Sequence, residues 1–283
     1  MSPRSRATPR RRVATPRLAI AALIALVAIA AFAPLTAPFH PAEQPDAALA
    51  KNLPPSIEHP FGTDGYSRDV LSRVIYGART SLAVAGISVL VALALGTAVG
   101  AVAGFAGGNV DRWLMRGVDA VLSVPRLLLL LVIAAAFGQL SLGGLILVLG
   151  LTGWPAMSRI VRAQVREMAA LDHVLAARAL GVQPGRILAR HVMPGVWPQV
   201  LVAATLAVAS VIPLEAGLSF LGLGIPAPAP SWGNIMLEGY EQQLRSWWLV
   251  VFPGIAIITT VLAVNVIGER LRESLDPRLR PPV

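Results

Sequence analysis

The sequence has no cysteine and comparatively few charged side chains. The absence of cysteine excludes disulfides, thiolate metal sites and cysteine nucleophiles. Charged residues make up 14% of the 283 positions, whereas about 25% is usual in soluble domains. Apolar residues make up 55% and the mean hydropathy is +0.67, which is more apolar surface than one soluble core of this size can bury. The composition therefore predicts a protein embedded in a membrane.

Two further absences limit the chemistry that this chain can perform. Its four histidines show no metal-ligand spacing, and no glycine-rich loop ends in the Gly-Lys-Ser/Thr sequence that holds a nucleotide phosphate. The histidines are His40, His59, His173 and His191. We therefore expect no catalytic residue, metal or cofactor on this chain, and we expect any ATP and Mg²⁺ to be bound by partner chains.

Six apolar stretches are long enough to cross a bilayer, two of them only when they are extended. They comprise residues 18–39, 81–106, 118–137, 142–157, 200–223 and 247–267. The third reaches this length by running back past Asp119 and Pro125, and the fourth by continuing beyond Trp154. The sequence thus predicts an all-α integral membrane protein with six transmembrane helices.

The first stretch follows a basic segment, a pattern that also fits a cleaved signal peptide. Residues 31–33 resemble a cleavage site, but Pro34 would follow the cut and the apolar run continues beyond it. We therefore expect this stretch to be retained as an uncleaved membrane anchor.

Basic residues are distributed unevenly between the segments that connect the apolar stretches. If the N-terminus is placed in the cytoplasm, 19 of the 24 basic side chains fall in cytoplasmic segments. Those segments are residues 1–17, 107–126, 155–197 and 270–283. This positive-inside bias predicts that both termini are cytoplasmic. The formal net charge of +9 is therefore explained by topology and gives no reason to expect nucleic acid.

The segment 40–79, placed outside, begins with a proline-rich part and ends with apolar residues at helical spacing. These residues are Tyr66, Val70, Leu71, Val74 and Ile75. The pattern predicts an amphipathic helix on the outer membrane surface that leads into the second apolar stretch, with Thr63 as a candidate N-cap.

The segment 155–197, placed inside, has the pattern of two short helices joined by a turn. Asp172 is a candidate N-cap of the first helix, and Gly181 can end that helix in a left-handed conformation. Pro184 suits the first turn of the second helix, which we expect to stop near Pro194. The shape fits a groove on another protein and the surface of lipid headgroups equally well.

The same segment resembles the EAA loop of ABC-transporter permeases, in which Glu-Ala-Ala is followed by three residues, a glycine and a later Leu-Pro. The resemblance rests on residues 176–181, Ala-Ala-Arg-Ala-Leu-Gly, and 190–194, Arg-His-Val-Met-Pro. Leu175 replaces the glutamate and Met193 the leucine. Asp172, one helical turn earlier, is a candidate to supply the missing carboxylate.

Further segments resemble the dipeptide/oligopeptide/nickel branch of these permeases, and within it the second, C-type, subunit. They are residues 59–64, 68–73, 76–82, 215–224 and 230–233. Together these segments extend the resemblance over residues 17–280, in the same order along the chain.

The resemblance implies the fold of a type I ABC importer transmembrane domain. It divides the chain into a basic cytoplasmic tail at 1–17, a first transmembrane helix with an extracytoplasmic segment at 18–79, the permease domain at 80–269 and a cytoplasmic C-terminal tail at 270–283. The EAA-like loop, at 155–197, lies within the permease domain.

The resemblance also implies partners in the cell membrane of a bacterium. A homologous second permease completes the translocation path, two ATPase subunits receive the coupling helices, and an extracytoplasmic binding protein delivers the solute. On this interpretation Ala176, Ala177 and Gly181 allow close docking of an ATPase. Arg178 and Arg186 either add charge at that interface or serve only as topology signals.

Glu215 is the one acidic residue in the fifth apolar stretch, where an unpaired charge costs on the order of 3 kcal/mol. It could face the translocation path and meet a cation, such as a peptide amino terminus or a metal ion. Alternatively, it is structural and pairs with an arginine or caps a break near Pro213. We favour the structural role, because the motif around it is shared by permeases for different solutes.

The sequence therefore predicts a permease subunit of an ATP-driven importer for peptides or a related solute such as a nickel complex. One alternative is a secondary transporter that works alone on an ion gradient, with Asp119 and Glu215 as its midspan acids. Another is a membrane enzyme or scaffold without transport activity.

Overall fold

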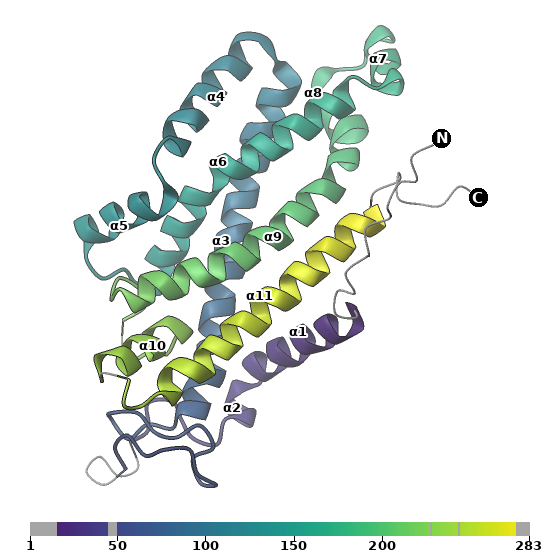
Figure 1. Cartoon of the computed structure of the whole chain (residues 1–283). Helices are drawn as coiled ribbons and strands as arrows, with labels where there is room; N and C mark the ends of the chain where they lie inside the picture. The colour runs from purple at the N-terminus through teal and green to yellow at the C-terminus, as the bar shows by residue number, and fades with distance from the viewer. Residues whose placement is uncertain (1–15, 45–49, 227, 243, 276–283) are drawn as a thin grey trace, which may run out of the picture.

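The computed structural model describes residues 16–44, 50–226, 228–242 and 244–275, and in these residues the chain is a bundle of helices (Figure 1). The helices are α1 (Pro16–Ala31), α2 (Ala33–Thr36), α3 (Val70–Ala106), α4 (Gly108–Leu122), α5 (Arg126–Phe137), α6 (Leu142–Ala169), α7 (Asp172–Ala179), α8 (Pro184–Ile187), a π-helical turn (Leu188–Val192), α9 (Met193–Phe220), α10 (Trp232–Glu241) and α11 (Trp248–Leu275). The all-helical architecture predicted from the sequence is confirmed.

Among the described residues, four helical segments are long and apolar enough to cross a membrane: α3, α6, the continuous stretch Pro184–Phe220 and α11. The helices α4 and α5 could form a fifth span, but they are bent by 74° relative to each other. The predicted count of six unbroken spans is therefore not met. The third stretch is broken at Pro125, because proline disfavours a helical conformation at the residue before it.

The first predicted stretch is also shorter than expected. The helix α1 ends at Ala31, and residues 33–36 form the separate short helix α2. Pro34 lacks the N–H that a continuous helix would use there, which accounts for the break.

Glycines bring the backbones of α3 and α6 close together. A Cβ atom added at Gly100 would lie 2.5 Å from the carbonyl oxygen of Ser158 and 2.8 Å from Cβ of Val161. Cβ atoms added at Gly96 and Gly104 would lie 2.6 and 2.8 Å from the nearest atoms of the same helix. Glycine at these three positions therefore lets α3 and α6 pack in close contact.

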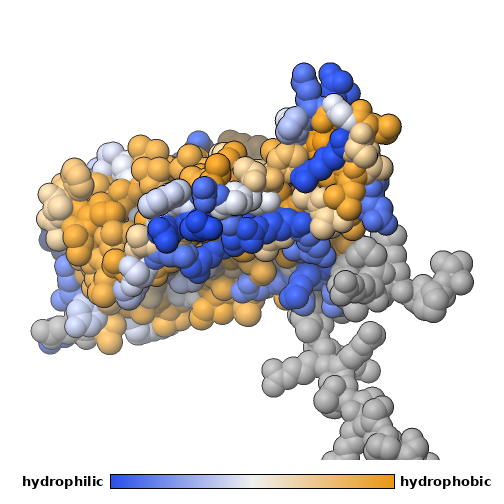
Figure 2. Space-filling model, turned by 90° about the horizontal axis from the view of Figure 1, so that it is seen from above, coloured by the Kyte–Doolittle hydropathy of each residue, from blue (hydrophilic) through white to orange (hydrophobic). Residues whose placement is uncertain are grey.

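The α4 helix lies against the second half of α6 and is tied to it by ion pairs. Arg162 and Arg166 of α6 both pair with Asp111 of α4, and Arg159 pairs with Asp119. Asp119, a candidate midspan acid in the sequence, is exposed and has this arginine as its partner. Figure 2 shows hydrophilic residues crossing an otherwise largely hydrophobic face on the side where α4 and α6 lie.

The amphipathic helix predicted to lead from the outer surface into the second apolar stretch begins later than expected, and its polar residues are buried. The helix α3 begins at Val70 and runs unbroken to Ala106, and its N-cap is Asp69, whose side chain accepts from the backbone N–H of Ser72 at 2.7 Å. Thr63 is buried in the preceding segment and caps no helix. The predicted amphipathic surface is wrong because the polar residues between the apolar ones, such as Arg68, Asp69 and Arg73, are buried and form ion pairs inside the protein.

The segment 155–197 is more helical than the sequence indicated. The helix α6 continues to Ala169, and the residue before α7 is Leu171, so Asp172 is the first helical residue and its side chain makes no capping bond. Gly181 has φ of +76°, as its predicted left-handed role requires.

The second predicted helix does not stop near Pro194. The π-helical turn Leu188–Val192 places this proline in the first turn of α9, where its missing N–H breaks no intrahelical bond. The helix therefore continues from the loop into the membrane-spanning part of α9.

Candidate functional site

The α7 helix and the turn after it protrude from one end of the bundle (Figure 1). The beginning of α1 and the end of α11 lie at the same end, which agrees with placing α7 and both ends of the chain on one side of the membrane. Beneath α7, a cluster of buried apolar side chains that includes Val174, Ile187 and Val196 fixes the protrusion to α8 and α9.

Most of the residues predicted to dock an ATPase are exposed, on α7, the turn after it, α8 and the first turn of α9. They are Asp172, Ala176, Arg178, Gly181, Arg186 and Pro194. Ala177 differs, because it is buried inside the chain with 7% exposure and belongs to the cluster beneath α7. It therefore shapes the loop from within and offers no free surface to a partner.

Two apolar side chains at the tip of the protrusion are strongly exposed. Leu175, which stands where the EAA pattern has glutamate, is 48% exposed, and Leu180 is 83% exposed. Nearby, the guanidinium of Arg178 stacks over the ring of Phe105 at 5.1 Å, beside a hollow of about 490 Å³. The protrusion thus combines an apolar tip with a basic flank, which is typical of a surface that meets another protein.

Glu215 is completely buried at the junction of α3, α9 and α10. Its carboxylate accepts hydrogen bonds from Ser81 of α3 at 2.9 Å and from Ser219 of its own helix at 2.8 Å. The hydroxyl of Ser81 also accepts from the backbone N–H of Trp232, at 3.4 Å. Both structural alternatives predicted for Glu215 are wrong. Among the described residues it forms no ion pair. The helix α9 also continues unbroken through Pro213, so Glu215 caps no break there and serine hydroxyls satisfy its carboxylate instead.

A buried ion-pair cluster at the opposite end from α7 was not predicted from the sequence. Asp64 accepts from Arg68 at 2.7 Å and from Arg73 at 2.5 Å, and Glu238 of α10 pairs with both arginines. The two arginines stand in motif segments of the sequence, but their partner Glu238 is 165 or more positions away. No local pattern could have identified that pairing.

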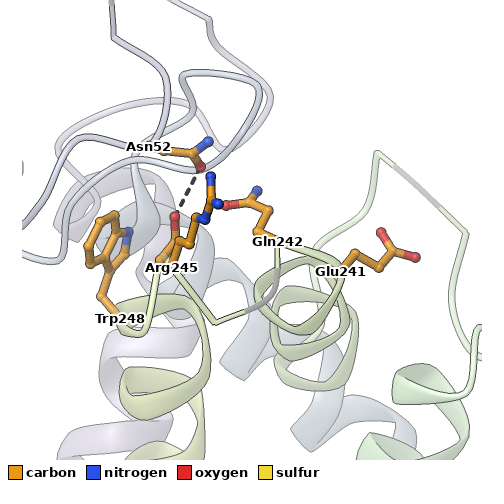
Figure 3. Close-up of a pocket in the computed structure, with 6 residues that line it drawn as sticks. Asn52, Glu241, Gln242, Arg245 and Trp248 are labelled. Atoms are coloured by element: carbon orange, nitrogen blue, oxygen red, sulfur yellow. Dashed lines mark hydrogen bonds between the residues drawn. The ribbon is translucent and has the colours of Figure 1, made fainter.

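Next to this cluster, the segment before α3 and the turn before α11 enclose a hollow of about 480 Å³ (Figure 3). Its lining includes Asn52, Gln242 and Arg245, and the hydroxyl of Ser246 donates to Oδ1 of Asn52 at 3.2 Å. Trp248 forms the apolar wall, and its Nε1 donates to the backbone of Thr63 at 2.9 Å. This polar hollow is on the end that the topology places outside.

A third hollow, a cavity of about 280 Å³, lies between α3, α6 and α9 and has one cationic side chain in its lining. That cation is Arg126, the first residue of α5, whose Nη2 donates to the carbonyl oxygen of Leu149 at 2.7 Å. Arg126 falls at the end of the predicted cytoplasmic segment 107–126, but its side chain lies against Leu149 and Thr152, in the middle of the apolar residues 142–157 of α6. The signal that could have revealed it is a basic residue inside the predicted stretch 118–137, directly after the helix-breaking Pro125.

Comparison with known proteins identifies the family of this chain. The family described as "Binding-protein-dependent transport system inner membrane component" matches residues 96–281. A protein of Brucella suis biovar 1 named as a peptide permease is 41% identical over 266 residues, which are 93% of this chain and 87% of that protein. The dipeptide transport system permease protein DppC of Bacillus subtilis is 38% identical over 274 residues, which are 95% of this chain and 85% of that protein.

The fold is similar to that of solved transporter structures. A chain of the MetNI methionine ABC transporter, in an inward-facing conformation, matches with a TM-score of 0.61 and 19% identity over 73% of this chain and 98% of that chain. Another crystal form of MetNI gives a TM-score of 0.60 at the same identity, over 72% of this chain and 96% of that chain. The chain therefore belongs to the family of binding-protein-dependent transport system inner membrane components, and it is a permease subunit of an ABC importer.

Proposed function

We propose that this permease carries di- and oligopeptides into a bacterial cell. The observation that supports this most directly is the 41% and 38% identity to proteins named as a peptide permease and a dipeptide permease, over more than nine-tenths of the chain. A nickel complex, the other solute that the sequence pattern allowed, is the competing cargo.

The proposal includes a second, homologous permease and two ATPase subunits that hydrolyse ATP. The support on this chain is the protruding α7 helix and the turn after it, because Leu175 of α7 and Leu180, which directly follows α7, are exposed although they are bulky. Burying both against an ATPase would remove apolar surface from water, which stabilises the complex. The remaining contact surface in this proposal consists of the exposed residues Asp172, Ala176, Arg178, Gly181, Arg186 and Pro194.

The helical connection between the protrusion and the membrane supplies a mechanical link. Residues 184–220 form one continuous helical stretch, so a displacement of α8 is carried directly into α9. In this proposal, closure of the ATPases moves α7 and α8, and α9 then changes the side to which the membrane cavity opens. The binding protein meets the opposite end, where the hollow lined by Asn52 and Arg245 is located.

Both termini are cytoplasmic in this arrangement, as the distribution of basic residues predicts. The structure supports this placement because α1 begins and α11 ends on the same side of the bundle as α7 (Figure 1). Asp172 keeps its candidate role as the carboxylate that replaces the glutamate of the EAA pattern, since it is exposed one turn before Leu175.

The test is uptake by the complete transporter in proteoliposomes that enclose ATP. This chain is reconstituted with its second permease, the ATPase subunits and the binding protein, and accumulation of radiolabelled dialanine is measured. Uptake that requires both ATP and the binding protein supports the proposal. Uptake of nickel without peptide overturns the peptide cargo, and ion-driven uptake by this chain alone overturns the ATP-driven mechanism.

A further inference from the structure

Arg126 is a cation placed at the middle of the apolar part of a membrane helix. Its guanidinium lies against Leu149 and Thr152, which are central in the apolar residues 142–157 of α6. Gly153 makes room for it, since a Cβ atom at that position would lie 3.1 Å from Nη2 of Arg126. Arginine at this depth is costly, and such residues usually mark an ion or substrate path.

No carboxylate in the described part of the chain pairs with Arg126. A guanidinium has five N–H donors. Two of them are used here, one by the carbonyl oxygen of Leu149 at 2.7 Å and one, at 3.4 Å, by Oγ1 of Thr152. The remaining donors, on Nη1 and Nη2, are available to a ligand.

The side chain of Arg126 lines a cavity whose other walls are mainly apolar. Its volume of about 280 Å³ is close to the lower bound of about 300 Å³ for small-molecule sites. Ala92 of α3, Ala207 of α9 and Met157 of α6 form part of the walls, and Ser88 and Ser210 add hydroxyl groups. A mainly apolar cavity with one charged side chain in its lining, a cation, favours a small ligand with a single anionic end.

We propose that Arg126 binds the carboxylate of the transported solute, which for a peptide is its C-terminal carboxylate, while the solute crosses the membrane. The inference rests on the proposed peptide cargo and adds the chemistry by which the membrane path recognises it. A planar guanidinium with free donors on both terminal nitrogens can bind both oxygens of a carboxylate. The transported carboxylate thereby becomes the counter-ion that the chain itself does not provide.

The experiment compares two probes that differ only at this group, dialanine and dialanine amide. Each is supplied to the reconstituted complete transporter at a concentration that saturates the binding protein, so that selection before the membrane is equal. Uptake is measured for the unmodified transporter, Arg126→Gln and Arg126→Lys. Arg112→Gln is the matched control, because Arg112 is an exposed arginine that bonds only to neighbouring Asn109, at 3.1 Å.

We expect Arg126→Gln to lower dialanine uptake about tenfold or more and to leave uptake of the amide unchanged. Arg126→Lys, which keeps the charge, should recover part of the dialanine uptake, and Arg112→Gln should match the unmodified transporter. An equal loss for both probes, in complexes that assemble normally, would show that Arg126 only supports α6 and would overturn the inference. If the unmodified transporter carries neither probe, the proposed peptide cargo fails together with it.

Discussion

Arg73 and Glu238, which are 165 positions apart, form a two-point ion pair between the start of α3 and α10. Nη1 of Arg73 donates to one carboxylate oxygen at 2.5 Å, and Nη2 donates to the other at 2.8 Å. The same Nη1 donates to Asp64 at 2.5 Å. The pair therefore holds the segment before α3, α3 itself and α10 together at the end opposite α7.

Replacing Glu238 should destabilise this end of the molecule. The Glu238→Gln variant leaves the guanidinium groups of Arg68 and Arg73 facing the single carboxylate of Asp64. Because the side chain of Glu238 is 19% exposed, we expect a loss of about 2 kcal/mol in the free energy of unfolding, below the loss of about 3 to 5 kcal/mol seen for fully buried pairs. The thermal unfolding midpoint of the detergent-solubilised protein measures it.

The control for this prediction is Glu273→Gln, which removes an exposed ion pair with Arg270 on α11. Exposed pairs contribute about 1 kcal/mol or less, so its unfolding midpoint should barely change. Equal midpoints for the two variants would contradict a stabilising role for the cluster.

The sequence located the apolar segments well because hydropathy is a local property. The apolar core of α3, α6, α9 and α11 lies within the stretches 81–106, 142–157, 200–223 and 247–267. The helix ends were less predictable, because polar residues that read as solvent-facing are paired across the fold. Arg73 illustrates this, since its spacing fits the wet face of a surface helix and yet it is 2% exposed.

The candidate site shows the same division between local and distant information. Gly181 was predictable, because a glycine after a short helix is a local signal for a left-handed residue. The inward orientation of Ala177 and the serine partners of Glu215 depend on where α8 and α3 pack, and no pattern within the loop or the span encodes that. The location of Arg126 was not predictable, because the 74° bend between α4 and α5 places this residue against Leu149 of α6.

The close contact between α3 and α6 predicts a strong effect of a single methyl group at Gly100. In Gly100→Ala the new atom would lie 2.5 Å from the carbonyl oxygen of Ser158, so the helices must separate, at a cost of about 1 to 3 kcal/mol. Gly86→Ala is the matched control on the same helix, because no atom lies within 4 Å of its added Cβ. Thermal unfolding should separate the two variants, and a Gly100→Ala protein as stable as Gly86→Ala would refute the close packing.

Glu215 offers a test between its structural and transport roles. In Glu215→Leu the hydroxyls of Ser81 and Ser219 lose their acceptor inside the protein, which costs about 1 to 3 kcal/mol for each group left unpaired. Glu215→Gln should cost less, because the amide keeps an acceptor oxygen and serine hydroxyls can turn to accept from its NH₂ group. We expect Glu215→Leu to lower the yield of assembled complex and its uptake in parallel.

The contrary result for Glu215 is equally clear. If Glu215→Leu assembled at the normal yield but transported no solute, the carboxylate would act in the translocation path, and its burial between serines would describe only one state of the transporter. Yield by size-exclusion chromatography and uptake per assembled complex distinguish the two outcomes.

The turn after α7 predicts a loss of coupling that exceeds any loss of stability. Gly181 has φ of +76°, a conformation that costs a residue with a side chain about 1 to 2 kcal/mol. Gly138, at the opposite end of the molecule, has φ of +73°, and an added Cβ at either position has no atom within 4 Å. Gly181→Ala and Gly138→Ala should therefore lower the unfolding midpoint by similar amounts. Only Gly181→Ala should reduce both the ATPase that copurifies with the permease and the uptake per ATP hydrolysed, because strain there displaces α7 relative to α8. Equal ATPase recovery from the two variants would show that the turn does not position the docking surface.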